Sequence, residues 1–573
     1  MNRKYIYIIM VAMLTAFATE MAGEEKNHNF AVARNLETFS AIYKNLDMMY
    51  VDTLDADVTV GQGITAMLRS LDPYTEYYAA SDMKDLKQML TGKYAGIGAL
   101  IKKDLRTGRV VIDELYEGMP AERAGLRKGD QIVAIDDSSM VGKEVAQVSS
   151  KLRGEPGTTF LLKVERPMLT GTKTGTGTLA GTKAKTKTLK LKITRGAIQL
   201  PSVPYYGMMG DGVGYIVLSQ FTEDCSRDFR RALVDMRGKG MKKLVFDLRG
   251  NGGGSLQEAI KIVNMFVGKG TTLVTTKGKL KRSNNVYRTE QEPLDTVMPV
   301  VVLVNESTAS ASEITAGSLQ DLDRAVVMGT RTYGKGLVQQ TVDLPHNGSL
   351  KLTVSKYYIP SGRCIQAINY KHTGGGYREH IPDSLTKEFT TRGGRKVRDG
   401  GGIKPDIEVK PDTMTNIAMY LFRGALDSTE VVHYYVTDYV NRHERIAPVE
   451  DFHITESDYA DFKRRVMESG FKYDRETSKV YDKLVEMAKF EGYYDDAKGE
   501  FEALERKLQH NLERELDSNR EMIRQMLEQE IVTAYYYQKG RIAYMVDTDS
   551  QVKRAKELLM DEEAYIGELR VKN

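Results

Sequence analysis

The sequence predicts a multidomain α/β protein, in which an α/β core carries an inserted β-rich domain, an N-terminal helical segment and a C-terminal helical domain. Over residues 198–412, strand-like runs rich in Val and Ile alternate with helical stretches, a pattern typical of an α/β layer domain. Residues 86–197 contain short strands separated by Gly-rich turns. Both ends of the chain repeat apolar residues at helical spacing. The 573 residues are enough for about three to five domains.

The first 22 residues have the layout of a secretory signal peptide. Arg3 and Lys4 precede an apolar run from Tyr5 to Ala18, and residues 16–18 (AFA) offer an A-x-A cleavage site. The run is short for a membrane span, and an uncleaved anchor helix is the alternative. We therefore expect an exported protein of the periplasm or cell envelope. The N-terminal helical segment follows over residues 23–85 and contains the turn LDPYTEYY.

The β-rich domain, residues 86–197, contains four strand-like runs: YAGIGALIKK, RVVIDEL, QIVAID and TFLLKVER. One helix interrupts them, because Val145, Val148 and Leu152 recur on one helical face. Residues 168–188 are a low-complexity insertion of Gly, Thr and Lys, which predicts a long, solvated hairpin loop.

The core and the C-terminal domain differ in pattern. The core, residues 198–412, contains the strand-like runs GVGYIVLSQF, KKLVFDLRG, MPVVVLVNE and RAVVMGTRT, with helical stretches such as SLQEAIKIVNMFVG between them. The C-terminal domain, residues 413–573, is charged and mostly helical. Its apolar stripe consists of Leu504, Leu508, Leu512, Leu516, Ile523, Leu527 and Ile531. The stripe predicts a packing face, within the chain or against a second copy.

The composition excludes several classes of protein. The formal net charge of +4 is too small to indicate nucleic acid as the main partner. The only cysteines are Cys225 and Cys364, which excludes a disulfide-dense scaffold and leaves either one bridge or two free thiols. The chain has no HExxH motif and no cluster of His and Cys in the sequence, so we expect no metal and no other cofactor.

A group of small hydroxyl side chains follows one buried strand, in VLVNESTASASEITAG (residues 302–317). Residues 310–313 (SASE) match a capping box, in which the serine hydroxyl and the glutamate bind backbone N–H groups at a helix start. The position also suits a nucleophile, because a serine at a strand-to-helix junction projects beyond the sheet, beside N–H groups that stabilise an oxyanion. None of the eight histidines is close to it in sequence.

Lys335 is the candidate base for such a nucleophile. It stands in RTYGKGLVQQ, between Gly334 and Gly336, so its backbone can approach another loop closely. Lysine is a known partner of catalytic serine, provided that burial leaves the amine neutral. A surface lysine in a Gly-rich turn is the alternative.

These segments together resemble the carboxy-terminal processing proteases, also called tail-specific proteases, of peptidase class S41. STASASEITAGSLQD and YGKGLVQ resemble the catalytic segments of that family. LDPYTEYY, YAGIGALI, PAERAGLRKGDQIVAIDD, LRGEPGTTF, GYIVLSQF, VFDLRGNGGG, TVSKYYIPSGRCIQ and GIKPDIEV occur in the family's order. The resemblance covers residues 35–410 and implies an S41 protease core over 198–412 and a PDZ domain over 86–197. The 168–188 insertion and the C-terminal domain depart from it.

The resemblance implies roles for individual residues of the core. Ser310 would be the nucleophile. Lys335 would be the general base that later returns the proton to the leaving amine, and Gln339 would hold the lysine by a hydrogen bond. The backbone N–H groups of Gly253 and Ala311 would form the oxyanion hole.

The PDZ segment is expected to bind the end of a polypeptide. Gly96, Ile97 and Gly98 precede a strand, where successive N–H groups can cradle a carboxylate. The edge of that strand can pair with an extended peptide, while the helix with Val145 and Val148 walls an apolar pocket.

The expected function is that of a serine endopeptidase with a Ser-Lys dyad, which recognises polypeptide C-termini through its PDZ domain and cleaves exported proteins near them. Ser312 and Glu313 would then be structural. An adaptor or activator protein and a homo-oligomer are partners that the sequence leaves open. One alternative is a catalytically inactive PDZ scaffold, against which the presence of Ser310, Lys335 and Gln339 argues. The other is a metal-dependent hydrolase, for which the ligand motifs are missing.

Overall fold

The computed structural model describes residues 28–83, 93–167, 186–367, 382–423, 429–473, 476–508 and 511–571. The chain forms two compact units, Met1–Tyr77 and Tyr78–Asn573. The predicted signal peptide lies outside the described residues, as does the predicted 168–188 insertion except for its last three residues. None of the helices in these described ranges is long and apolar enough to cross a membrane.

The first unit is helical, as the sequence predicts. It contains a helix over residues 28–49 and the helix α2 (Ala56–Arg69). Asp55 caps α2, because its carboxylate accepts the Val58 N–H at 3.0 Å.

The second unit begins with the β-rich domain, which the fold-class prediction anticipates. Its sheet has the order β3-β4-β5-β7-β8, with β6 paired to β5, and β2 pairs separately with β9. The strands are β2 (Lys93–Gly96), β3 (Ala99–Lys103), β4 (Val110–Leu115), β5 (Gln131–Ile135), β6 (Ser138–Ser139), β7 (Thr159–Pro167), β8 (Thr186–Thr194) and β9 (Gly196–Gln199). The helices α4 (Pro120–Arg123) and α5 (Val145–Leu152) complete it.

The α/β core is built on a sheet of order β10-β11-β12-β15-β16-β21, parallel except for the β10–β11 pair. Its strands are β10 (Tyr205–Met208), β11 (Val213–Val217), β12 (Lys243–Asp247), β15 (Val300–Val304), β16 (Val326–Gly329) and β21 (Ile407–Glu408). The helices α6 (Cys225–Gly238), α7 (Leu256–Val263) and α8 (Ala311–Asp321) contribute to the core cluster on one face. Both cysteines are free, so the alternative of a disulfide bridge is excluded.

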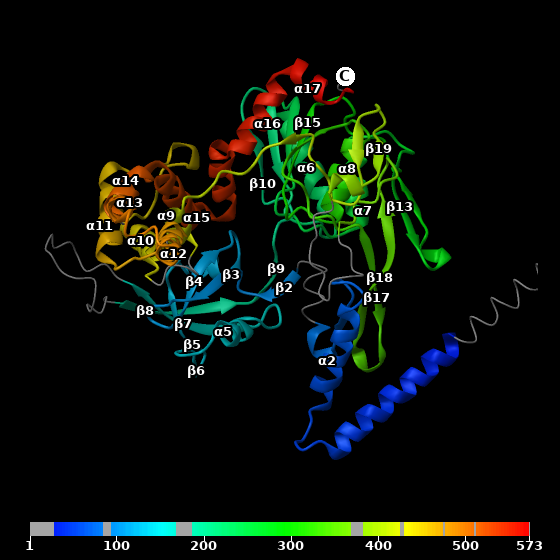
Figure 1. Ribbon diagram of the computed structural model, residues 1–573, viewed down its shortest axis with the longest axis horizontal. Coiled ribbons are helices and arrows are strands. Elements are labelled where there is room, and N and C mark those ends of the chain that lie inside the picture. The colour runs from blue at the N-terminus through cyan, green and yellow to red at the C-terminus, as the bar shows by residue number, and fades with distance from the viewer. Residues whose placement is uncertain are drawn as a thin grey trace, which may run out of the picture. The chain divides into compact units, whose positions relative to one another are not determined.

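The other face of this sheet is covered by the end of the chain. The helices α16 (Ser550–Met560) and α17 (Glu562–Glu568), red in Figure 1, pack beside the core strands. Alternate residues of β15 face the two layers: Val300, Val302 and Val304 pack with α6–α8, whereas Val301 and Leu303 pack with α16. Residues 550–568 therefore form a layer over this face of the core sheet.

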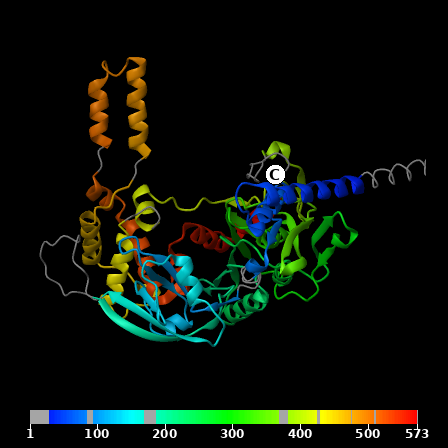
Figure 2. The ribbon, with the colours of Figure 1, turned by 90° about the horizontal axis from the view of Figure 1, so that it is seen from below.

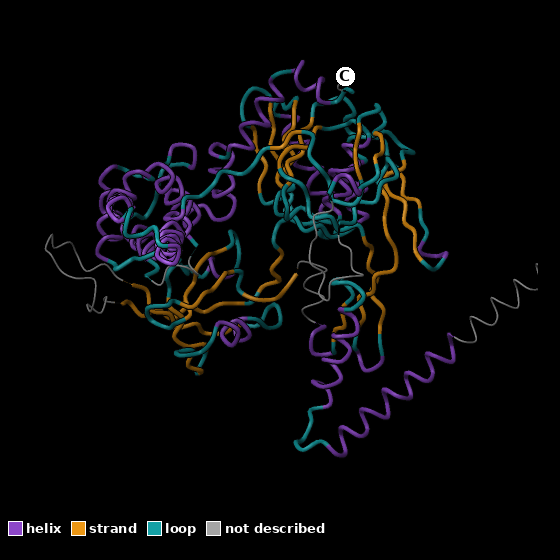
Figure 3. Tube along the Cα trace, viewed as in Figure 1, coloured by secondary structure: helices purple, strands orange, loops and turns teal. Residues whose placement is uncertain are grey.

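A second, antiparallel arrangement of strands adjoins the core (Figure 3, where all strands are orange). β17 (Leu337–Asp343) pairs with β18 (Ser349–Tyr358), β18 with β13 (Thr272–Gly278), and β13 with β14 (Val286–Arg288). A short hairpin of β19 (Glu388–Thr390) and β20 (Lys396–Arg398) follows.

The C-terminal helices form a cluster of their own before the chain returns to the core. They are α9 (Asn416–Phe422), α10 (Val431–Arg442), α11 (Glu456–Glu468), α12 (Glu476–Glu491), α13 (Lys498–Leu508), α14 (Leu512–Ser518) and α15 (Arg520–Thr548). α12 and α13 run side by side as a hairpin (Figure 2). Of the predicted stripe, Leu516, Ile523, Leu527 and Ile531 are fully buried in this cluster, whereas Leu504 is exposed.

α10 holds the β-rich domain through a polar contact. The Glu430 carboxylate pairs with the Lys102 ammonium at 2.9 Å and accepts the Leu105 N–H at 2.7 Å. The Tyr434 hydroxyl donates to the Asp104 carboxylate at 2.6 Å. Gly129 lies so close to Thr437 that an added Cβ would stand 2.3 Å from the threonine methyl. The C-terminal domain is therefore in contact with both the β-rich domain and the core.

Candidate active site

Ser310 stands at the turn between the end of β15 and the start of α8, where the sequence predicts a strand-to-helix junction. Its backbone has φ 57° and ψ −115°, a left-handed conformation that is strained for a residue with a side chain. Strained strand-to-helix turns of this kind expose a nucleophilic serine in other hydrolases. The strained backbone therefore supports a functional role for Ser310 that a helix cap alone does not require.

Glu313 joins the serine turn to the loop of Lys335. Its side chain is fully buried. One carboxylate oxygen accepts the N–H groups of Ser310 and Lys335, both at 2.9 Å. The other accepts the Gly334 N–H at 2.7 Å and the Thr332 hydroxyl at 2.5 Å. One carboxylate thus fixes the backbones of the candidate nucleophile and the candidate base with respect to each other.

A second link between the two loops comes from Tyr357, near the end of β18. Its buried hydroxyl lies 3.3 Å from the carbonyl oxygen of Ser310 and donates a short hydrogen bond to the carbonyl of Lys335. The glycines beside Lys335 allow the close approach that the sequence predicts. A Cβ on Gly334 would lie 2.3 Å from the Ala367 Cβ, and one on Gly336 would lie 2.8 Å from the Gln366 nitrogen.

Glu313, Thr332 and Tyr357 are site residues that sequence reasoning missed. Residues 310–313 match a capping box, so Glu313 was predicted to bind only the helix start, and that hydrogen bond to the Ser310 N–H is present. No local pattern signals the contacts of the same carboxylate to residues 332–335. Thr332 and Tyr357 lie in segments that the sequence analysis singled out, but nothing in those segments indicates these two contacts.

Glu313 gives a stability prediction, because burial raises the pKa of its carboxyl to about 7 although four hydrogen bonds lower it. An acid with a raised pKa stabilises the fold below its ordinary pKa and loses that contribution as the pH rises through its folded value. We expect the free energy of unfolding of the wild type, relative to that of Glu313→Gln, to be larger at pH 5 than at pH 8, by at most about 3 kcal/mol. A stability difference that grows as the pH rises would show that the hydrogen bonds lower the pKa of Glu313 by more than burial raises it.

The predicted oxyanion residues lie directly beside Ser310. A Cβ added to Gly253 would stand 2.8 Å from the Ser310 Cβ and 2.9 Å from the Ala311 nitrogen, so only glycine fits there. In this structure the Gly253 N–H donates to the Asn251 side-chain oxygen at 2.9 Å. An oxyanion role for Gly253 therefore requires this bond to open when substrate binds. Ala311, the other predicted oxyanion donor, is the first residue of α8.

Gln339 lies on β17, immediately after an irregularity in the pairing with β18. Its side-chain amide donates to the Thr353 hydroxyl at 3.2 Å. The predicted hydrogen bond from Gln339 to Lys335 stays a prediction.

The predicted peptide groove would lie between β3 and α5. Among the described strands, β3 forms one edge of its sheet, and α5 packs beside it. Gly96 ends β2, Ile97 is buried, and Gly98 has a φ of 72°, with its Cβ position only 2.4 Å from the Met119 Cβ. On α5, Val145 is half-buried and faces this domain's core cluster.

Val148, the other predicted pocket residue, is more deeply buried than Val145. Its side chain is fully buried in the core of the β-rich domain. The residue therefore anchors α5 to this domain, whereas Val145 is half-buried.

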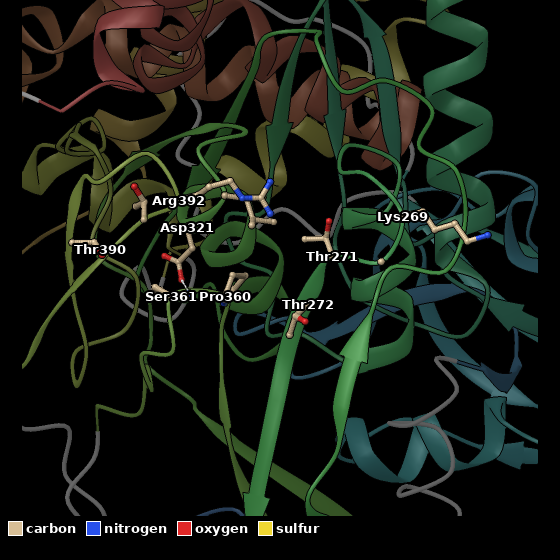
Figure 4. A pocket seen from close by; sticks show the side chains of 11 residues that line it. Lys269, Thr271, Thr272, Asp321, Pro360, Ser361, Thr390 and Arg392 are labelled. Carbon is tan, nitrogen blue, oxygen red and sulfur yellow. Dashed lines mark hydrogen bonds between the residues drawn. The ribbon is translucent and has the colours of Figure 1, made fainter.

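A cavity of about 600 Å³ lies elsewhere in the core, and none of the predicted site residues lines it. Figure 4 shows Asp321 beside Ser361, with the Lys269 amine pointing away from them. The Asp321 carboxylate accepts the Ser361 N–H at 2.9 Å and pairs with the buried Arg363 guanidinium at 2.8 Å. Asp321 thus ties the end of α8 to this segment, which is a structural role.

Comparison with known proteins identifies the architecture. Residues 212–373 match the model of peptidase family S41, and residues 111–166 match that of the PDZ domain. Residues 422–559 match the model described as "Probable PDZ-protease, C-terminal helical domain". The chain is 34% identical over 375 residues to the carboxy-terminal-processing protease of Bartonella bacilliformis, an alignment that covers 64% of this chain and 81% of the relative.

The chain belongs to the carboxy-terminal-processing proteases of peptidase family S41. This confirms the predicted family, the fold class and the assignment as a serine-type peptidase that acts on polypeptides. The "Probable CtpA-like serine protease" of Staphylococcus aureus is 32% identical over 371 residues, which cover 64% of this chain and 69% of that protein. Among solved structures, a photosystem II D1 C-terminal processing protease is 27% identical, with a TM-score of 0.35 and coverage of 65% and 86% of the two chains.

Proposed function

We propose that this carboxy-terminal-processing protease works through a Ser310–Lys335 dyad, holds polypeptide C-termini in its PDZ groove, and cleaves exported proteins near those termini. The observation that carries the dyad is the Glu313 carboxylate, which accepts the backbone N–H groups of both Ser310 and Lys335. Two loops are thereby fixed together at the residues whose side chains would exchange a proton.

In the proposed mechanism, the neutral amine of Lys335 takes the proton of the Ser310 hydroxyl as its oxygen attacks the scissile carbonyl. The negative charge that develops on the carbonyl oxygen is stabilised by the Ala311 N–H at the start of α8, and by Gly253 once its bond to Asn251 opens. Lys335 then protonates the leaving amine, and water releases the acyl group from Ser310.

The proposed groove uses main-chain hydrogen bonds along the edge of β3, while the Gly96–Gly98 segment receives the terminal carboxylate and Val145 contacts an apolar side chain. The proposed export rests on the basic and apolar N-terminal segment with its A-x-A site.

The function is tested by incubating the purified chain with an unstructured polypeptide that carries an apolar C-terminus, and by identifying the fragments by mass spectrometry. We expect cleavage near that terminus. A chain that leaves the polypeptide intact, or that only trims it from the amino end, would contradict the proposal.

Recognition of a free C-terminus makes a separate prediction. Amidation of a peptide substrate should raise its KM about fivefold, because a charge-assisted hydrogen bond to the carboxylate is replaced by a neutral one. The control is Gly98→Ala, whose added Cβ clashes with Met119 and must shift the loop. In that variant, the preference for the free acid should shrink. Equal KM values for acid and amide in the wild type would exclude this recognition mode.

A further inference from the structure

Arg249 links the end of the chain to the loop beside the candidate nucleophile. It lies two residues after the end of β12 and directly precedes the glycine-rich segment 250–254. Its guanidinium binds the Asp247 carboxylate at 2.6 Å, the Asp549 carboxylate at 2.7 Å and the Gln551 side-chain oxygen at 2.7 Å. One side chain therefore joins the core to the junction between α15 and α16.

This contact is largely shielded from solvent. The side chains of Arg249 and Asp549 are only 15% and 16% exposed, and that of Asp247 is 4% exposed. Asp247 also accepts the Tyr215 hydroxyl at 2.7 Å. The arrangement places one guanidinium between two carboxylates, so its removal would leave both acids facing each other without a cation.

The C-terminal side of the contact is held independently. Asp549 is the N-cap of α16, because its other carboxylate oxygen accepts the Val552 N–H at 3.0 Å. Gln551 also donates a hydrogen bond to the Val409 carbonyl, just beyond β21. α16 itself is seated on the sheet by its apolar residues. The two partners of Arg249 are therefore fixed to the core.

The loop that Arg249 begins touches the serine turn at several points. Gly250 donates its N–H to the Asn305 side chain at 2.9 Å, and the Asn251 carbonyl accepts both the Ala309 N–H at 3.0 Å and the Ser312 hydroxyl at 2.9 Å. Gly253 lies against Ser310. A displacement of this loop would move the candidate oxyanion donor relative to the nucleophile.

We propose that Arg249 is a positioning residue, through which Asp549 and Gln551 of the C-terminal domain hold the 250–254 loop in the geometry required for turnover. This inference rests on the proposed Ser310 mechanism. It gives the C-terminal domain a part in catalysis in addition to its contacts with the β-rich domain.

The test compares kcat and KM for a short peptide among Arg249→Met, Arg249→Lys and Asp549→Asn. Misplacement of reacting groups by 1 Å can cost ~100-fold, so we expect Arg249→Met to lower kcat by that order and to change KM by less than about twofold. Arg249→Lys should recover part of the loss. Asp549→Asn, which keeps a good N-cap, should lose roughly tenfold in kcat.

The matched control is Lys556→Met. Lys556 also joins α16 to the core, because its ammonium donates to the Met209 carbonyl at 2.7 Å and pairs with Asp211 at 3.0 Å. Both partners precede the amino end of β11, so this contact does not involve the 250–254 loop. The thermal midpoint of Lys556→Met should fall about as much as that of Asp549→Asn, while kcat stays unchanged. The inference is wrong if Arg249→Met keeps wild-type kcat, if its loss is confined to KM, or if Lys556→Met loses as much kcat. A wild type without cleavage would instead overturn the proposed function and this inference together.

Discussion

Replacing Ser310 by alanine should lower the rate of cleavage roughly 10⁴-fold or more, while the fold stays intact. The hydroxyl is the proposed attacking group, and alanine cannot replace it. Alanine adds no backbone strain at the φ of 57°, because serine already carries a Cβ there. The Ser310 N–H keeps its bond to Glu313, so the change should cost about 1 kcal/mol or less in stability. Peptide cleavage and thermal midpoint measure the two effects.

Ser312 provides the matched control for this experiment. Its hydroxyl is fully buried and donates to the Asn251 carbonyl at 2.9 Å, which still receives the Ala309 N–H when the hydroxyl is removed. Ser312→Ala should therefore cost about 1 kcal/mol of stability and keep most of the activity. If Ser312→Ala is inactive and Ser310→Ala is active, the nucleophile has been assigned to the wrong serine.

The strands of the core could be predicted because their signal is local. The run of residues 300–304, all Val and Leu, indicates a strand buried on both faces, and β15 is buried throughout. The identity of the second layer could not be predicted. Val552, Ala555, Leu558 and Leu559 show that α16 has an apolar face, but helical spacing does not say what that face covers. Its partner strand lies more than two hundred residues earlier in the chain.

The same limit applies to the site. Short-range rules found one of the Glu313 hydrogen bonds, the one to Ser310, because a capping box spans only a few residues. The bonds from that carboxylate to Gly334 and Lys335 depend on how α8 and the following loop pack together. Ser310 and Lys335 themselves were found through chemistry and family resemblance. The residues that orient them became visible only in three dimensions.

Replacing Lys335 by arginine should remove activity as completely as the loss of Ser310. The guanidinium stays protonated, so it cannot accept the serine proton even though it keeps the positive charge and the length of the side chain. Backbone contacts hold this position: the Lys335 N–H binds Glu313, and its carbonyl receives the Tyr357 hydroxyl. The substitution should therefore alter the head group without displacing the loop.

Three measurements separate this mechanism from a merely structural lysine. Wild-type kcat should rise with pH as the amine loses its proton, and Lys335→Arg should show no such rise. Lys335→Met, which is uncharged and similar in length, should be equally inactive, whereas a histidine in its place offers a ring nitrogen that can accept a proton and should keep a trace of activity. The thermal midpoints of the arginine and methionine variants should stay near that of the wild type. Near-normal turnover by Lys335→Arg would mean that another group activates Ser310, and the Ser-Lys mechanism would have to be abandoned.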